Sequence, residues 1–274
     1  ISVDFNRQAF AWGRTAAHDM AAVQKLAGPK ERVAQVIEFK RHSNAATALD
    51  ELIAHRAALL TDYQNGAYAR QYLALVEQVR LAESTLSEAG KPLRLTAAVA
   101  RYFYKLMAYK DEYEVARLHT DPAFADKIAG MFEGDYTLKF HLAPPLWAKR
   151  DANGHLIKKE FGPWMMHAFR WLAKLKFLRG TALDIFGYAE ERKIERALIE
   201  QYRQSITALL PKMTADNVAT LTAIAGIPEY IRGYGHVKQQ HLKEAKEKEL
   251  ALLAVFNSTN SPLNTPQADG RQAT

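Results

Sequence analysis

The chain has 274 residues, of which 48% are hydrophobic and 24% are charged, and its formal net charge at pH 7 is +7. This composition is typical of a globular protein with a substantial core, and no run of about 18 apolar residues predicts a membrane-spanning helix. The chain contains no cysteine. This excludes disulfides, thiolate zinc sites, nucleophilic thiols and cysteine-ligated iron–sulfur clusters within it, and it agrees with the reducing cytoplasm that we expect as its compartment.

The first predicted helices follow from apolar residues that recur at steps of three and four. This period predicts one helix over residues 5–26. Over residues 49–86 it continues across the Asn65-Gly66 pair, which predicts either two consecutive helices or one long helix kinked at the glycine. Thr47 and Asp50 are three residues apart in front of this stretch, a spacing that suggests a capping box.

A further helix, rich in aromatic residues, is predicted over residues 95–113. It is followed by Asp121-Pro122, an N-cap residue with proline in the first helical position. This pair predicts the start of a short helix that ends near Phe132.

The pattern changes after residue 134. Apolar and polar residues alternate over residues 136–142, which is typical of a half-buried strand. Turn-forming residues at 151–154 and a possible partner strand at 155–161 complete the pattern of a hairpin. Because a two-stranded element is marginally stable alone, we expect it to pack on helices.

The helical period returns after Pro163 and predicts the rest of the fold. Helices are expected over residues 164–178, 189–210, 214–225, with Thr214 as the cap, and 236–256. Residues 257–274 are too polar to form a core and are predicted to be a disordered tail. The fold class is therefore mainly α, a multi-helix domain with a small β-hairpin insertion around residues 136–161.

Most of the excess positive charge lies between residues 149 and 179, a segment that contains eight basic and two acidic side chains. Two of the lysines precede a Gly-Pro turn and a predicted helix start, where anions are favoured. This pattern is compatible with a solvated basic face or with docking of an anion or an acidic partner. The candidate docking residues are Lys158, Lys159, Arg170, Lys174 and Arg179.

A second charged cluster lies on or after the aromatic-rich helix. Its spacings of three and four residues permit ion pairs along one helix, which is the simpler interpretation. The same residue types could instead form a general acid and base set. The cluster consists of Lys110, Asp111, Glu114, Arg117 and His119.

Motifs that would identify an independent catalyst are missing from the sequence. No two histidines have the four-residue spacing of a helical metal site, and no phosphate-binding loop is present. Gly233 and Gly235 lack the third glycine of a dinucleotide fingerprint and predict a tight bend before a helix. No nucleic-acid-binding motif is found, so no nucleic acid is expected as a partner. Because no two histidines have the spacing of a helical metal site, no bound metal is expected either.

Five stretches, taken together, resemble the C-terminal region of bacterial indolepyruvate:ferredoxin oxidoreductases. They follow the order of that family and read KLMAYKDEYEVARL (105–118), FHLAPPL (140–146), EFGPWM (160–165), FLRGTALD (177–184) and IRGYGHVK (231–238). The stretch VDFNRQAFAWGR (3–14) is similar to the closing helix of the gamma-type domain of 2-oxoacid oxidoreductases. The resemblance implies three parts: a junction or closing helix (1–27), a helical C-terminal domain (28–256) and the tail (257–274).

The resemblance also implies the activity of the whole enzyme. Aryl 2-oxo acids would be oxidatively decarboxylated to aryl-acetyl-CoA with thiamine diphosphate and Mg²⁺, and iron–sulfur clusters would pass the electrons to ferredoxin. The thiamine motif (Gly-Asp-Gly, later Asn-Asn) and the cluster cysteines are missing from this sequence. No catalytic, cofactor-binding or metal-binding residue can therefore be transferred, and the chain alone is expected to be inactive.

The expected role is consequently a non-catalytic one, in assembly or partner docking. Its expected partners are the remaining domains or subunits of the oxidoreductase, in an oligomer, together with ferredoxin and coenzyme A at the basic segment. The alternative is a free-standing basic module that binds a phosphate ligand, an acidic protein or nucleic acid.

Overall fold

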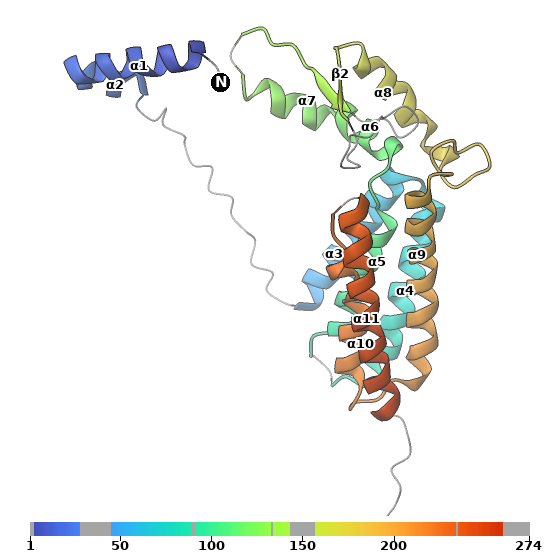
Figure 1. Cartoon of the computed structure of the whole chain (residues 1–274). Helices are drawn as coiled ribbons and strands as arrows, with labels where there is room; N and C mark the ends of the chain where they lie inside the picture. Colours follow the sequence, from blue (N-terminus) through green and yellow to red (C-terminus); the bar gives the residue numbers. More distant parts are fainter. Residues whose placement is uncertain are drawn as a thin grey trace, which may run out of the picture. The chain divides into compact units, whose positions relative to one another are not determined.

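The computed structural model describes residues 3–27, 45–88, 91–132, 134–142, 157–233 and 235–259, and it divides into two compact units, residues 1–41 and 42–274 (Figure 1). The first unit contains α1 (Val3–His18) and α2 (Met20–Ala27). Asp19 separates them, and its Oδ1 accepts a hydrogen bond from the Ala22 N–H at 2.9 Å. Two helices thus replace the single helix predicted for this stretch, because Asp19 caps the second one.

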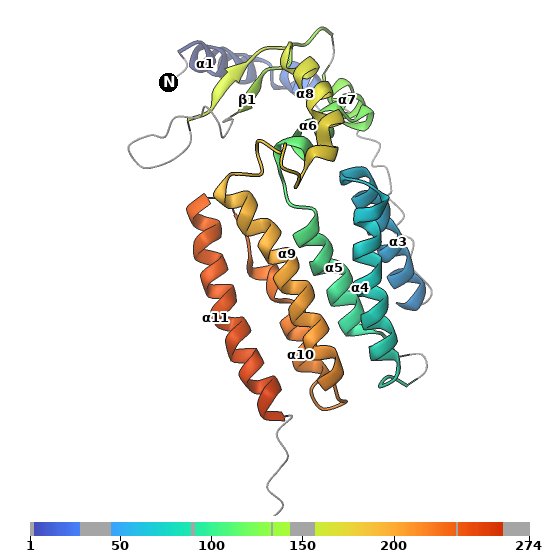
Figure 2. The same ribbon diagram turned by 90° about the vertical axis from the view of Figure 1, so that its right-hand side faces the viewer.

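Most of the second unit is a helical bundle, whose long helices run side by side in Figure 2. Its α-helices are α3 (Ala45–Tyr63), α4 (Gly66–Ser84), α5 (Arg94–Met107), α9 (Glu190–Leu209), α10 (Val218–Ala225) and α11 (Gly235–Thr259). Its short 3-10 helices are η2 (Leu210–Lys212) and η3 (Ile227–Tyr230), whereas η1 (Leu175–Leu178) belongs to the smaller lobe described below. Helix α5 is central, since it contacts α3, α4, α9, α10 and η3.

The bundle core contains stacked aromatic rings. The ring of Phe103 on α5 lies 6.3 Å from that of Tyr72 on α4 and 5.7 Å from that of Tyr202 on α9. Both tyrosine hydroxyls donate to backbone carbonyls, Tyr72 to Ala100 at 3.0 Å and Tyr202 to Ala225 at 2.9 Å. The core can therefore bury these phenols without leaving a polar group unsatisfied.

The break between α3 and α4 settles the two alternatives left open by the sequence. The Asn65 side chain accepts a hydrogen bond from the Tyr68 N–H at 2.9 Å, which caps α4 and makes two helices rather than one kinked helix. The predicted capping box at Thr47 and Asp50 is wrong, because both residues lie inside α3. The period of the apolar residues thus predicted this helix correctly. The Thr47–Asp50 pair predicted a start that is too late, because α3 begins at Ala45.

Helix α5 receives its cap from the neighbouring helix α4. Glu83 is buried, and its carboxylate accepts hydrogen bonds from the Leu95 N–H, the Thr96 N–H and the Thr96 hydroxyl, at 2.7–2.9 Å. The N-cap residue of α5, Leu93, has no side chain that could do this. Glu83 therefore satisfies the free N–H groups of the first turn of α5.

A smaller lobe of the second unit is inserted between α5 and α9. It contains α6 (Glu112–Thr120), α7 (Pro122–Ala129), β1 (Phe140–Leu142), β2 (Lys159–Phe161) and α8 (Met165–Lys174). The strands pair antiparallel with Phe140 opposite Phe161, which confirms the hairpin. Its own small core consists of Ala116, Phe140, Met165 and Phe169. The mainly α fold with a small β-hairpin insertion is therefore confirmed.

Two helix boundaries in the structure differ from the predicted ones. Asp121 caps α7 as expected, through the Ala123 N–H at 2.9 Å, but α7 ends at Ala129 rather than near Phe132. The residue at the cap position of α10 is Asn217, not Thr214, and its side chain binds back to the Thr214 N–H at 2.8 Å.

Part of the predicted tail, residues 257–259, belongs to α11. The rest of the tail and the predicted turn at 151–154 lie outside the described residues. Within the part of the chain that is described, none of the helices combines the length and the apolar character needed to cross a membrane.

Candidate functional site

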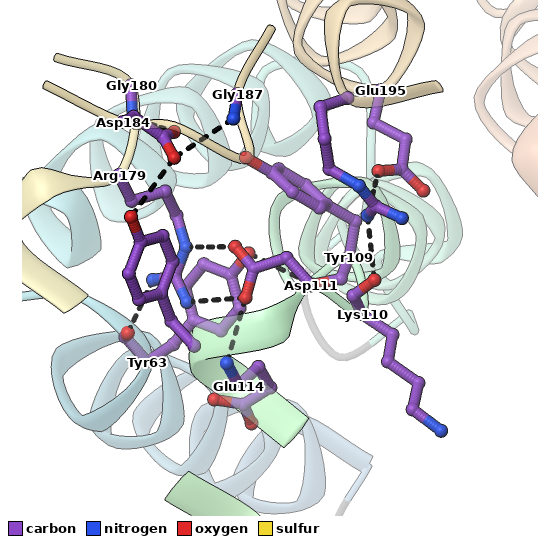
Figure 3. Close-up of polar contacts among 12 residues, drawn as sticks. Tyr63, Tyr109, Lys110, Asp111, Glu114, Arg179, Gly180, Asp184, Gly187 and Glu195 are labelled. Carbon is purple, nitrogen blue, oxygen red and sulfur yellow. Dashed lines mark hydrogen bonds and ion pairs between the residues drawn. The ribbon is translucent and has the colours of Figure 1, made fainter. Parts of the chain in front are cut away.

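A buried ion pair lies within the smaller lobe and reaches the bundle through Tyr63 (Figure 3). The Arg179 guanidinium donates from Nε to Asp111 Oδ2 at 2.5 Å and from Nη2 to Asp111 Oδ1 at 2.9 Å. It also donates from Nη1 to the Tyr63 carbonyl at 2.6 Å and lies 3.7 Å from the Tyr63 ring centroid. Burial opposes the charge of Arg179, but the hydrogen bonds to Asp111 hold its pKa above the usual value.

Local sequence explains the position of both partners. Helix α5 ends at Met107, and Asp111 is the N-cap of α6, where its Oδ1 also accepts from the Glu114 N–H at 2.8 Å. Arg179 follows η1, and Gly180 turns the chain there with a φ of +76°, a conformation that favours glycine. One carboxylate therefore both starts α6 and holds Arg179.

Asp184 organises the loop that follows Arg179. Its carboxylate accepts from the Gly180 N–H at 2.8 Å, the Gly187 N–H at 3.0 Å and the Tyr113 hydroxyl at 3.1 Å. A Cβ at Gly187 would lie 2.5 Å from Asp184 Oδ2, so a side chain there would displace the carboxylate. The loop is thus held rigidly against α6 by one buried acid.

The tyrosines around the ion pair are not suited to proton exchange near neutral pH. Burial raises the pKa of Tyr109 to about 12, and burial with the nearby Asp111 raises the pKa of Tyr63 further. The Tyr63 hydroxyl donates to the Tyr109 carbonyl at 2.9 Å. Both phenols remain protonated, and the Tyr63 hydroxyl acts as a hydrogen-bond donor in a structural network.

The predicted charged cluster does not form one site. Glu114 and Arg117 make the expected ion pair on α6, with both carboxylate oxygens bonded at 2.7–2.8 Å. Lys110, however, precedes α6 instead of sharing a helix with Glu114, and its carbonyl accepts from Arg192. His119 bonds to the Val115 carbonyl and packs among phenylalanine rings of the smaller lobe. The helix break at residues 108–111 separates Lys110 from Glu114, Arg117 and His119, which all lie on α6.

The predicted docking residues divide into two groups. Lys158, Lys159, Arg170 and Lys174 are exposed on β2 and α8, as docking requires. Arg179 is only 5% exposed, and its charge is used by Asp111, so its assignment to a docking surface is wrong. The sequence could not reveal this, because its partner lies 68 residues away.

One face of α8 is unexpectedly aromatic. Trp164 and Trp171 belong to the helical period of apolar residues that predicts this helix, yet they are 59% and 71% exposed. They are seven residues apart, and with His167 and Lys174 they occupy one exposed face, which we call the docking stripe (Trp164, His167, Trp171 and Lys174). The opposite face, with Met165 and Phe169, is buried against the small core.

Most of the chain matches the model of one known protein family. Residues 49–250 match a family model described as a family of unknown function (DUF6537). The match spans well over half of the chain. The chain belongs to this DUF6537 family. The comparisons with curated proteins and with solved structures gave no match.

The DUF6537 region begins within α3 and ends within α11. It therefore contains the bundle, the smaller lobe, the Asp111–Arg179 pair and the docking stripe, while the first unit lies outside it. Within the described ranges of the chain, no group of three or more His, Cys, Asp or Glu side chains is arranged to hold a metal ion.

Proposed function

We propose that this chain is an assembly and docking domain of an indolepyruvate-type 2-oxoacid:ferredoxin oxidoreductase. In this proposal, other domains carry thiamine diphosphate, Mg²⁺ and the iron–sulfur clusters, and the DUF6537 region holds the enzyme together. The observation that carries the proposal is the docking stripe, since two tryptophans on one exposed helix face are typical of an interface rather than of free surface.

Burial of the stripe would contribute substantially to association. A tryptophan side chain can bury about 150–250 Å², and apolar burial contributes about 25 cal/mol per Å². Because Trp164 is 59% and Trp171 71% exposed, the two side chains could thus contribute roughly 5–8 kcal/mol before the costs of association. Such a contribution is large enough to decide whether subunits stay together.

The basic side chains beside the stripe suit an acidic partner. Lys158 and Lys159 lie at β2, Arg170 lies on α8, and Lys174 Nζ is 5.4 Å from the Trp171 ring centroid. Cations next to aromatic rings steer acidic proteins and orient them at short range. We assign to these four side chains the contacts with ferredoxin or with the phosphates of coenzyme A.

The stretches that carry the family resemblance support a positioning role. Residues 105–118 and 177–184 contain Asp111, Arg179 and Asp184, so they supply the network that holds the smaller lobe together and contacts the bundle at Tyr63. A domain that presents a docking helix needs such a rigid base. In the first unit, Phe10 and Trp12 on α1 are also exposed, as suits a helix that packs against the gamma-type domain.

We expect the variant Trp164→Ser/Trp171→Ser to dissociate the complete oxidoreductase. The loss of two interface anchors should shift the enzyme from its assembled form to smaller species in size-exclusion chromatography with light scattering. The free energy of unfolding of the chain should change by less than about 0.5 kcal/mol, because both side chains are exposed.

The matched control is Leu250→Ser, which removes an exposed apolar side chain from α11. It should leave the assembly intact. An unchanged assembly in the double tryptophan variant, or an equal loss in both variants, would contradict the proposed role of the stripe.

A further inference from the structure

A cleft of about 280 Å³ opens beside the N-terminal part of α11, within the second unit. Its lining includes the apolar side chains of Leu106, Leu198 and Ile231. Its remaining walls are strongly cationic and come from α5, from the α5–α6 connection and from the residues around the start of α11. The cationic lining residues are Lys105, Lys110, Arg232 and Lys238.

The charge of this lining is unbalanced. Four cations line the cleft with one carboxylate, Glu195, and the Glu229 carboxylate pairs with Arg232 beside it, so the net charge of these six groups is +2. Glu195 is shared, since it pairs with Lys238 and also with Arg192 at 2.5 Å. The Lys105 ammonium donates to neutral groups, the carbonyls of Pro228 at 2.7 Å and Glu229 at 3.2 Å. Backbone carbonyls fix its position without neutralising its charge.

The cations are close enough to influence one another. Burial lowers the pKa of Lys105, and the positive charges of Arg232 and Lys238 lower it further, although Glu229 opposes them. Arg232 itself is held by the Glu229 carbonyl at 2.9 Å and by its carboxylate at 3.4 Å. A fixed group of cations that repel each other is a preorganised site for an anion, which would relieve the repulsion.

The backbone beside the cleft is shaped by glycine. Gly233 has a φ of +85°, and a Cβ there would lie 2.8 Å from Val237 Cγ1. A side chain at this position would therefore strain the turn and crowd α11. The glycine keeps Arg232 and Lys238 on the same cleft.

We propose that this cleft binds a small phosphate-bearing ligand, such as a diphosphate group. A diphosphate concentrates about three negative charges in a compact volume, which matches the lining better than a single carboxylate does. The apolar lining residues could accept the organic part of such a ligand. This inference is independent of the proposed assembly role, which rests on α8.

The test is titration calorimetry of the full chain with inorganic pyrophosphate, at constant ionic strength. We expect saturable binding at one site and no saturable binding of acetate. Arg232→Glu and Lys110→Glu each replace an exposed side chain and lower the net charge of the six charged groups at the cleft from +2 to 0. Each should weaken pyrophosphate binding at least about tenfold.

The control is Lys243→Glu, which has the same charge change on an exposed residue of α11 outside the cleft lining. It should leave the Kd for pyrophosphate within about twofold. The proposal is overturned if pyrophosphate shows no saturable binding up to roughly 10 mM, if acetate binds equally well, or if Lys243→Glu weakens binding as much as the cleft variants do. A circular dichroism spectrum of each variant confirms that it is folded.

Discussion

The variant Arg179→Met is expected to lower the free energy of unfolding by about 3–5 kcal/mol. Methionine preserves much of the side-chain volume, but it leaves the Asp111 carboxylate buried without its cation. It also removes the hydrogen bond to the Tyr63 carbonyl and the contact with the Tyr63 ring. Urea unfolding followed by circular dichroism measures the change.

An exposed ion pair provides the control for this experiment. Arg203 and Glu200 on α9 pair at 2.6 Å, but both side chains are about half exposed. Arg203→Met should therefore cost less than about 1 kcal/mol. In addition, Arg179→Met/Asp111→Leu should recover part of the loss, because no unpaired charge remains buried. If Arg179→Met costs no more than Arg203→Met, the pair does not hold the smaller lobe.

The variant Glu83→Ala is expected to lower the free energy of unfolding by about 3 kcal/mol. Three donors, the N–H groups of Leu95 and Thr96 and the Thr96 hydroxyl, would lose a charged acceptor. Leu95 and Thr96 are fully buried, so water cannot easily replace the carboxylate. The same urea titration measures the loss.

Glu77→Ala provides the comparison for Glu83 on the same helix. The Glu77 side chain is exposed, and its contact with Arg80 is long, at 3.8 Å. Its replacement should change the free energy of unfolding by less than about 0.5 kcal/mol. Equal effects at the two positions would show that Glu83 does not cap α5.

Local signals explain why much of the fold could be predicted from the sequence. Asn65 and Asp121 cap helices through bonds to residues two or three positions ahead, so the signal and its effect share a few residues. The hairpin was predicted because alternation reveals a strand without knowledge of its neighbours. The same local view failed at Thr47, where a capping pattern lies inside α3.

Long-range contacts explain what could not be predicted. Asp111 and Arg179 lie 68 residues apart, and no local pattern distinguishes a buried arginine from an exposed one. The helical period of α8 placed its tryptophans on an apolar stripe, but only the packing against α6 decides which face is covered. The cleft likewise combines residues from near positions 105 and 232. These sites depend on tertiary structure.

We propose that this chain serves an aryl 2-oxoacid:ferredoxin oxidoreductase as a non-catalytic assembly domain. The most direct test is 2-oxoacid-dependent reduction of a viologen acceptor, with thiamine diphosphate, Mg²⁺ and coenzyme A supplied. The isolated chain should be inactive, and the complete enzyme should lose both its activity and its assembly when residues 45–259 are deleted. A complete enzyme that stays assembled and fully active without this segment would contradict the claim.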